Sequence, residues 1–265
     1  MISSVVGPVQ AQAPAGFNWR QFWILFGAAI LGVVALQPYA LHVFSATAVS
    51  LHKPLWAVAL SGALNIIVLA TLGIVIGMRL GKRIGLGVPI LEACLAGESV
   101  GAQIREVLLI AVPTGAIAAS FVPLIDKYYF VPRIPALAQP GLVTPAWMGF
   151  LASFCGGIDE ELMLRFGFLT LLAWLIVKVT RIPVGRTTAA VFWAANILAA
   201  LAFGAGHLPA TRALVPLTSI VVLRALSLNG YMGIILGYLY WKRGLECAMV
   251  AHFCADIVVH VLLGT

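Results

Sequence analysis

The sequence predicts an all-α fold, a polytopic transmembrane bundle of about eight helices. Hydrophobic residues make up 62% of the 265 residues, only 9% are charged, and the mean hydropathy is +1.05. A soluble domain carries a much larger charged fraction, about 25%. Several apolar stretches are long enough to cross ~30 Å of hydrocarbon at about 1.5 Å per residue. The bilayer is therefore the expected surrounding of this chain.

The apolar stretches predict helices near 21–44, 54–78, 106–125, 145–178, 186–207, 213–225, 228–241 and 245–263. The sixth and seventh of these are shorter than the ~20 residues that a straight crossing needs. The polar run from Ser227 to Gly230 lies between them. They predict either two short helices or one broken helix, so seven crossings is the alternative to eight.

The loops divide the chain further. Segment 79–105 carries several Lys and Arg residues and predicts an interfacial loop with an amphipathic helix near 89–97. Placing this loop in the cytoplasm puts nine Lys and Arg inside and six outside. Segment 126–145 contains four prolines, which predict a connector and not a helix. We divide the whole chain into a short polar tail, residues 1–20, and a single transmembrane domain, residues 21–265, which includes both loop segments.

Charge and cysteine content exclude several classes of function. The net charge is +7, but the basic residues are scattered singly or in pairs between apolar segments. This pattern indicates contact with lipid headgroups, and we expect no nucleic-acid partner. The four cysteines include no CxxC pair, so neither a disulfide framework nor a thiolate metal cage is expected.

An acidic run lies inside the fourth apolar stretch, in GGIDEELMLRFGFL. Acids within the membrane are costly and are functional candidates for that reason. At 100° per residue, Glu161 and Arg165 share one helix face and can form an ion pair, while Glu160 lies about 100° away and can face a cavity. The alternative is that the whole run is a charged helix end in the headgroup region.

Two further segments carry histidines. In FGAGHLP, Phe203 lies one turn before His207 and could brace its imidazole, although a lone histidine at a helix end is more often an interfacial residue. In the last helix, His252, Asp256 and His260 follow one another at four-residue spacing and form one polar stripe. We expect His260 to reach headgroups or water and assign it no role.

Glu246 begins the last helix, where an acid interacts favourably with the helix dipole. We expect it to have no catalytic part.

Three motifs therefore occur in order on three apolar helices: Glu160-Glu161-xxx-Arg165, Phe203-xxx-His207 and His252-xxx-Asp256. Together they resemble the type II CAAX prenyl endopeptidase family, whose wider bacterial group is called the CPBP intramembrane proteases. The resemblance covers roughly residues 145–260, which we take as the catalytic core.

The resemblance implies a helical membrane fold with a conical cavity open to the membrane. It implies that Glu160 and His207 activate a water molecule, and that His252 and Asp256 stabilise the oxyanion of a tetrahedral intermediate. An aspartate stands where the best-studied members of the family have asparagine, and an ionised carboxylate cannot donate a hydrogen bond to an oxyanion. Asp256 must therefore be protonated, or must orient His252 instead.

The resemblance gives Glu161, Arg165 and Phe203 supporting parts. The sequence departs from the family pattern directly after Arg165, where Phe166 stands in place of a glycine. This departure bears on helix packing and not on the chemistry.

The predicted activity is that of an intramembrane endopeptidase that cuts a membrane-associated protein or peptide, either of the prenylated CAAX type or plain. No cofactor is expected, but two histidines and a glutamate could also hold zinc with an open position. Rival functions are a proton-coupled transporter and a non-catalytic scaffold or immunity protein. We expect a multi-pass protein of the prokaryotic cytoplasmic membrane, with the lipid bilayer and a membrane-associated substrate as partners.

Overall fold

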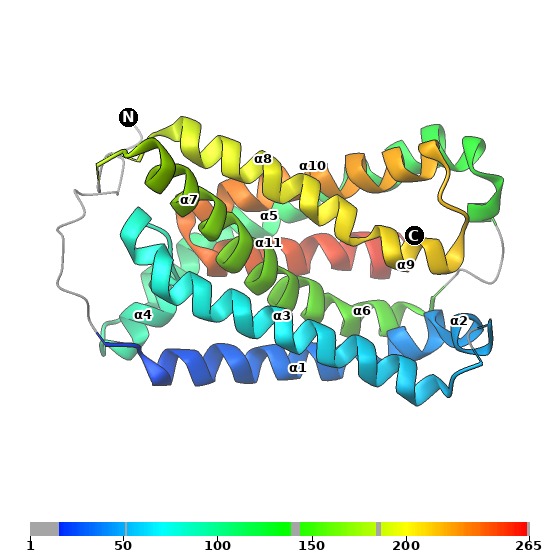
Figure 1. The fold of residues 1–265 in the computed structure, drawn as a ribbon, viewed down its shortest axis with the longest axis horizontal. Coiled ribbons are helices and arrows are strands. Elements are labelled where there is room, and N and C mark those ends of the chain that lie inside the picture. Colours follow the sequence, from blue (N-terminus) through cyan, green and yellow to red (C-terminus); the bar gives the residue numbers. More distant parts are fainter. Residues whose placement is uncertain (1–15, 51, 139–143, 184–186, 264–265) are drawn as a thin grey trace.

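The computed structural model describes residues 16–50, 52–138, 144–183 and 187–263, and within these ranges every regular element is helical. The predicted all-α class is confirmed, whereas most of the predicted polar tail lies outside the described residues. Long helices run side by side along the length of the molecule (Figure 1). They are α1 (Trp19–Val43), α3 (Leu55–Ile84), α5 (Gly101–Ile125), α6 (Ala146–Cys155), α7 (Thr170–Thr180), α8 (Ala189–Gly206), α10 (Ser219–Arg243) and α11 (Leu245–Asp256).

Shorter elements complete the bundle. Three are α-helices, namely α2 (Ser45–Ser50), α4 (Pro89–Leu95) and α9 (Leu208–Leu214). Four are π-helical, namely η1 (Asp126–Phe130), η5 (Gly156–Glu160), η6 (Leu162–Leu169) and η7 (Ile257–Leu262), and two are 3₁₀ turns, η2 (Val131–Arg133) and η3 (Pro135–Ala138). The amphipathic helix predicted near 89–97 is α4, at the left end of the bundle in Figure 1.

Seven helices in the described ranges are long and apolar enough to cross a membrane. The chain is therefore a multi-pass integral membrane protein. The predicted sixth and seventh helices form one element, α10, so seven crossings replace eight. Ser227 and Asn229 do not break α10, because Ser227 Oγ donates to the carbonyl of Leu223 and Asn229 Nδ2 to that of Ala225. These polar groups are thus satisfied within the helix itself.

The connector predicted to begin at residue 126 begins later. The chain stays helical from α5 through η1 and η2, so the third span reaches Arg133. The proline expected to stop the helix, Pro132, lies in the first turn of η2, where its missing N–H costs nothing. Arg224 of α10 forms a forked ion pair with Asp126 at 2.5 and 2.6 Å and fixes η1 against α10.

Seven crossings change the predicted charge distribution. Lys242 and Arg243 lie at the end that holds α4, because Arg243 pairs with Glu106 and Leu245 N–H donates to the carbonyl of Gly87. Arg224 lies at the opposite end beside Asp126. The predicted assignment of these three basic residues was therefore wrong, since it rested on eight crossings.

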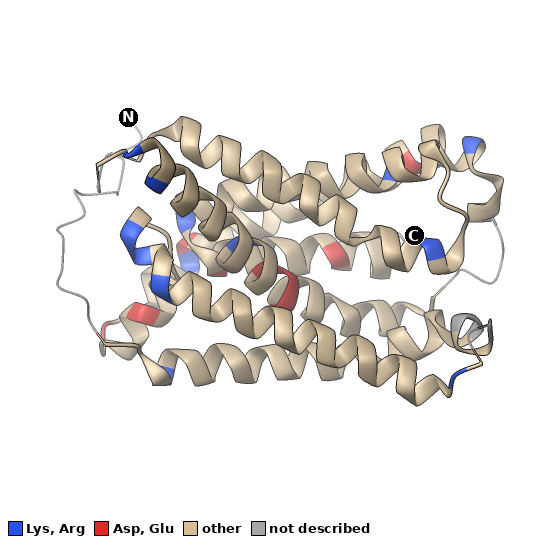
Figure 2. Cartoon of the chain, viewed as in Figure 1, with Lys and Arg blue, Asp and Glu red and all other residues tan. Residues whose placement is uncertain are grey.

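Basic residues gather at the α4 end of the bundle, on the left of Figure 2. Nine described Lys and Arg lie there: Arg20, Arg79, Lys82, Arg83, Arg105, Lys178, Arg181, Lys242 and Arg243. Five lie at the opposite end: Lys53, Lys127, Arg133, Arg212 and Arg224. Arg186, which the eight-helix count included, lies outside the described residues; without it that arrangement gives eight against six, so seven crossings give the larger difference between the two ends.

The helix from Ala146 to Thr180 runs through the centre of the bundle and carries the acidic run. Its middle contacts α3 closely because Gly73 and Gly167 lack side chains where the two backbones meet. Phe166 is buried against Gly77 of α3, where any Cβ would meet its ring. The departure from the family pattern at position 166 is therefore accommodated by a glycine on the neighbouring helix.

Candidate active site

The acidic run lies where the central helix is π-helical. Gly156–Glu160 and Leu162–Leu169 form two π-helical stretches on either side of Glu161. Such wide turns are rare and occur frequently at functional sites. The side chain of Glu160 is 28% exposed and that of Glu161 is 0% exposed. The two adjacent glutamates thus occupy different environments, as the helical periodicity predicts.

Glu161 is the centre of a buried ion pair. Its Oε1 lies 2.9 Å from Nη1 of Arg165 and 2.7 Å from Nδ1 of His252. Arg165 also donates from Nη2 to the carbonyl of Gly233 at 3.4 Å, and its guanidinium lies over the ring of Phe203 at 4.6 Å. The pair predicted from the four-residue spacing is therefore present, and a tertiary contact to α11 extends it. Charge-assisted contacts of this kind fix side-chain geometry in a low-dielectric interior.

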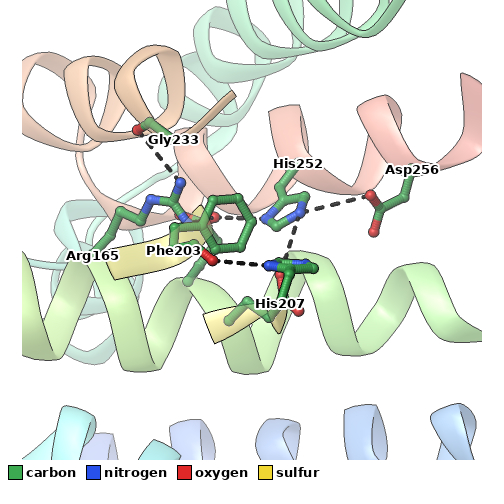
Figure 3. Close-up of polar contacts among 8 residues, drawn as sticks. Arg165, Phe203, His207, Gly233, His252 and Asp256 are labelled. Carbon is green, nitrogen blue, oxygen red and sulfur yellow. Dashed lines mark hydrogen bonds and ion pairs between the residues drawn. The ribbon is translucent and has the colours of Figure 1, made fainter. Parts of the chain in front are cut away.

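His252 presents one ring nitrogen to the site. Since the carboxylate of Glu161 only accepts, the Nδ1 of His252 carries a hydrogen and donates it. The opposite nitrogen, Nε2, lies 3.7 Å from Oε2 of Glu160 and 3.6 Å from Oδ1 of Asp256. Figure 3 shows the His252 ring between the Arg165 side and Asp256. One imidazole thus links the buried ion pair to the more exposed acids.

His207 has a similar orientation. Its Nδ1 lies 2.9 Å from the backbone carbonyl of Phe203, so that nitrogen carries the hydrogen and Nε2 is left unengaged by this contact. The Phe203 ring lies edge-on to the rings of His207 and His252, with centroid separations of 4.9 Å and 5.8 Å, respectively. The predicted bracing of His207 by Phe203 is therefore seen, and the same phenylalanine also contacts His252 and Arg165.

The seven predicted residues come from three parts of the sequence and meet in one place; Figure 3 labels Arg165, Phe203, His207, His252 and Asp256 there. The central helix contributes Glu160, Glu161 and Arg165. Helix α8 contributes Phe203, and His207 is the first residue after the end of α8. The last helix, α11, contributes His252 and Asp256. The site can therefore present a carboxylate, two imidazoles and a second carboxyl group to one small volume.

No group of three or more His, Cys, Asp and Glu side chains is arranged to hold a metal ion in the part of the chain that the structure describes. Of the residues that would hold zinc, His252 has its Nδ1 on Glu161 and His207 has its Nδ1 on the carbonyl of Phe203, so each histidine offers only Nε2. A chelator tests the zinc alternative.

The tertiary contacts of two neighbours of the site, Asp159 and His260, could not be predicted from the sequence. Asp159 is fully buried, and neither carboxylate oxygen meets a hydrogen-bond donor at normal distance among the described residues. It packs against Gly32 of α1, where a Cβ would meet its carboxylate. His260 is partly exposed; its Cβ packs against Gly149, and its ring centroid lies 6.4 Å from that of Tyr39. Only the tertiary packing of α1 and α6 defines these contacts.

Glu246 lies outside the site, in the first turn of α11, as predicted. Its Oε1 accepts the backbone N–H of Leu91 in α4 at 2.9 Å. It therefore joins α4 to the start of the helix that carries His252.

A family model described as type II CAAX prenyl endopeptidase Rce1-like matches residues 142–258. A search of curated proteins and a search of solved structures each returned no match. The matched range contains the buried ion pair, both histidines and Asp256. Residues 142–258 of this chain thus form a domain of the Rce1-like type II CAAX prenyl endopeptidase family.

Proposed function

We propose that the protein is an intramembrane endopeptidase that hydrolyses a peptide bond with water activated by Glu160 and His207. One observation carries this proposal: the partly exposed carboxylate of Glu160 lies 3.7 Å from Nε2 of His252, whose Nδ1 is held by the buried ion pair. A general base needs an accessible carboxylate held in a fixed place beside donors. Membership of the 142–258 domain in the Rce1-like family supports the same activity.

The first step forms the tetrahedral intermediate. Glu160 removes a proton from water, His207 holds the water through Nε2, and the water oxygen forms a bond to the carbonyl carbon. The carbonyl π electrons move to the oxygen, which becomes an oxyanion. A positioned base of this kind contributes roughly 10²–10⁴-fold to the rate.

His252 and Asp256 then stabilise the oxyanion. His252 donates from Nε2 when both ring nitrogens carry hydrogens, a state that the neighbouring carboxylate of Glu161 stabilises. Asp256 lies 3.6 Å from the same Nε2 and donates in its acid form. Donors placed where negative charge develops lower the barrier, because they need no reorganisation during the step.

The last step releases the products. Glu160 returns its proton to the nitrogen of the leaving amine, the carbon–nitrogen bond breaks, and the oxyanion reforms the carbonyl as a carboxyl group. The base of the first step thus serves as the acid of the second, and no further reactant is consumed.

We place residues 145–260 as the catalytic core of a single transmembrane domain, residues 21–265, in a prokaryotic cytoplasmic membrane. The α4 end carries nine of the described basic side chains and five lie at the opposite end, so the positive-inside rule assigns the α4 end to the cytoplasm. The substrate is a protein or peptide associated with the bilayer, prenylated or plain.

The test is cleavage of quenched fluorescent peptides, prenylated and plain, by the purified full chain in detergent. Glu160→Gln should lower kcat roughly 10²–10⁴-fold, because the amide cannot accept a proton. Asp159→Asn is the matched control, since it removes the carboxylate one residue earlier that faces α1, and it should cleave like wild type.

Three outcomes would contradict this mechanism. Loss of wild-type cleavage with a chelator would indicate a metal site. Absence of cleavage by folded wild type across a broad peptide panel would favour a scaffold. A flux driven by a pH gradient and lost in Glu160→Gln would favour a transporter.

A further inference from the structure

Gly156 begins the π-helical turn that ends at Glu160, and its α-carbon faces the catalytic side chains of α11. A Cβ at this position would overlap Oδ2 of Asp256 and lie 3.4 Å from Nε2 of His252. The backbone of Gly156 has φ −55° and ψ −56°, an ordinary right-handed helical conformation. Glycine is therefore required here for space and not for backbone conformation.

We propose that Gly156 is a positioning residue, which sets how closely Asp256 and His252 approach Glu160. The proposal rests on the proposed function, because it assigns a role within the same site. Gly156 touches no reacting atom in this scheme. It acts through the Asp256 carboxyl group, which occupies the volume that a side chain at position 156 would fill.

The surroundings determine which part moves when that volume is filled. The helix α11 is held closely against α5, because Gly115 of α5 lies directly against the backbone of Ala251. Ala251 is 0% exposed and Ala255 is 3% exposed, so the face of α11 on either side of His252 is already packed. The Asp256 side chain, in contrast, ends in a carboxyl group that can rotate about χ1.

An alanine at position 156 should therefore displace the Asp256 carboxyl group and leave the helices in place. Alanine is also the better helix former, so the substitution does not weaken the central helix by itself. The expected defect is in transition-state stabilisation, because the oxyanion donor is lost while the substrate still binds. In kinetic terms kcat falls and KM stays nearly constant.

The experiment is a double-mutant cycle on the full chain, with Gly156→Ala, Asp256→Ala and the double variant. Gly156→Ala alone should lower kcat by about tenfold or more, with KM and the midpoint of thermal unfolding near wild type. In the Asp256→Ala background the same substitution should lower kcat less than about twofold, because the group through which it acts is gone.

Gly157→Ala is the matched control. A Cβ at position 157 would lie 3.0 Å from the carbonyl oxygen of Met249 and 3.0 Å from Cβ of Phe253, so it presses on α11 without meeting Asp256. Its effect on kcat should be the same with and without the Asp256 side chain. The proposal would be overturned if Gly156→Ala lowered kcat by the same factor with and without the Asp256 side chain. It would also be overturned if Gly156→Ala kept the wild-type kcat.

A second measurement does not need activity. The ¹⁵N chemical shifts of the His252 imidazole should move in Gly156→Ala and in Asp256→Ala, and the double variant should show no further change. Gly157→Ala should leave these shifts near wild type. If the wild type cleaves no peptide, the proposed function fails while this cycle still decides the positioning role. Unchanged His252 shifts in Gly156→Ala would then reject it.

Discussion

Two carboxyl side chains of the central helix are completely enclosed, and they face opposite neighbours. Glu161 faces α11 and contacts both Arg165 and His252, whereas Asp159 faces Gly32 of α1 and has no charged partner in the described part of the chain. Burial alone therefore does not mark a reactive acid. The partners of each carboxyl group separate a positioned ion pair from an isolated acid, and the more exposed Glu160 lies between them in sequence.

The same difference in partners determines how each buried acid affects the stability of the fold. An ionised carboxylate without a charged partner is very unfavourable in an apolar interior, and Asp159 has no such partner among the described residues. Glu161 is compensated by a guanidinium and an imidazole, and its removal would leave Arg165 buried without a counter-ion. The side facing α11 should therefore tolerate substitution far less than the side facing α1.

The largest effect on stability is expected from Glu161→Gln. The amide leaves the guanidinium of Arg165 uncompensated, so the variant should lose about 3–5 kcal/mol of unfolding free energy. Thermal unfolding in detergent measures the change. Replacing both partners, as in Glu161→Gln with Arg165→Met, should be less harmful than Glu161→Gln alone. An equal or larger loss in the double variant would show that the pair is not the cause.

A smaller effect, on activity, should separate the two roles considered for Asp256. Asp256→Ala should lower kcat roughly 10²–10³-fold, the usual cost of one oxyanion donor. Asp256→Asn should stay within about tenfold of wild type, because the amide donates as the neutral acid does. Steady-state cleavage of one peptide by both variants makes the comparison. Equal losses in the two would mean that Asp256 acts through its negative charge on His252.

The smallest effect is expected on the side facing α1. Asp159→Asn has nearly the size of the acid and breaks no ion pair, so its unfolding free energy should lie within about 1 kcal/mol of wild type. Thermal unfolding and peptide cleavage, measured beside Glu161→Gln, check this. A loss comparable with that of Glu161→Gln would mean that Asp159 has an essential partner on α1, and the contrast between the two faces would no longer hold.

Much of the site follows from the sequence because its contacts are local. Glu161 with Arg165, Phe203 with His207, and His252 with Asp256 are each four residues apart, and helical periodicity alone places each pair on one face. That these pairs meet depends on tertiary packing, for which the order of the motifs and their resemblance to a family were the only indications.

The features that could not be predicted have tertiary or conformational causes. The direction of Asp159 depends on the close approach of α1 at Gly32, far away in the chain. The space that Gly156 leaves depends on where α11 packs. The continuity of α10 depends on Ser227 and Asn229 bonding back to carbonyls of their own helix, which composition does not show. The π-helical turns have no sequence signature.

Those turns have a consequence for the length of the central helix. A π-helical turn holds an extra residue, so it shifts the rotational phase between the parts of a helix on either side. In α6, Gly149 and Ser153 face inward while Trp147 and Phe150 face outward. Deleting one residue from η5 would turn this half by about 100° relative to Leu162 and bring bulky side chains inward. The number of residues between Ser153 and Leu162 therefore determines which face of α6 points into the bundle, as the identity of those residues determines the chemistry of the site.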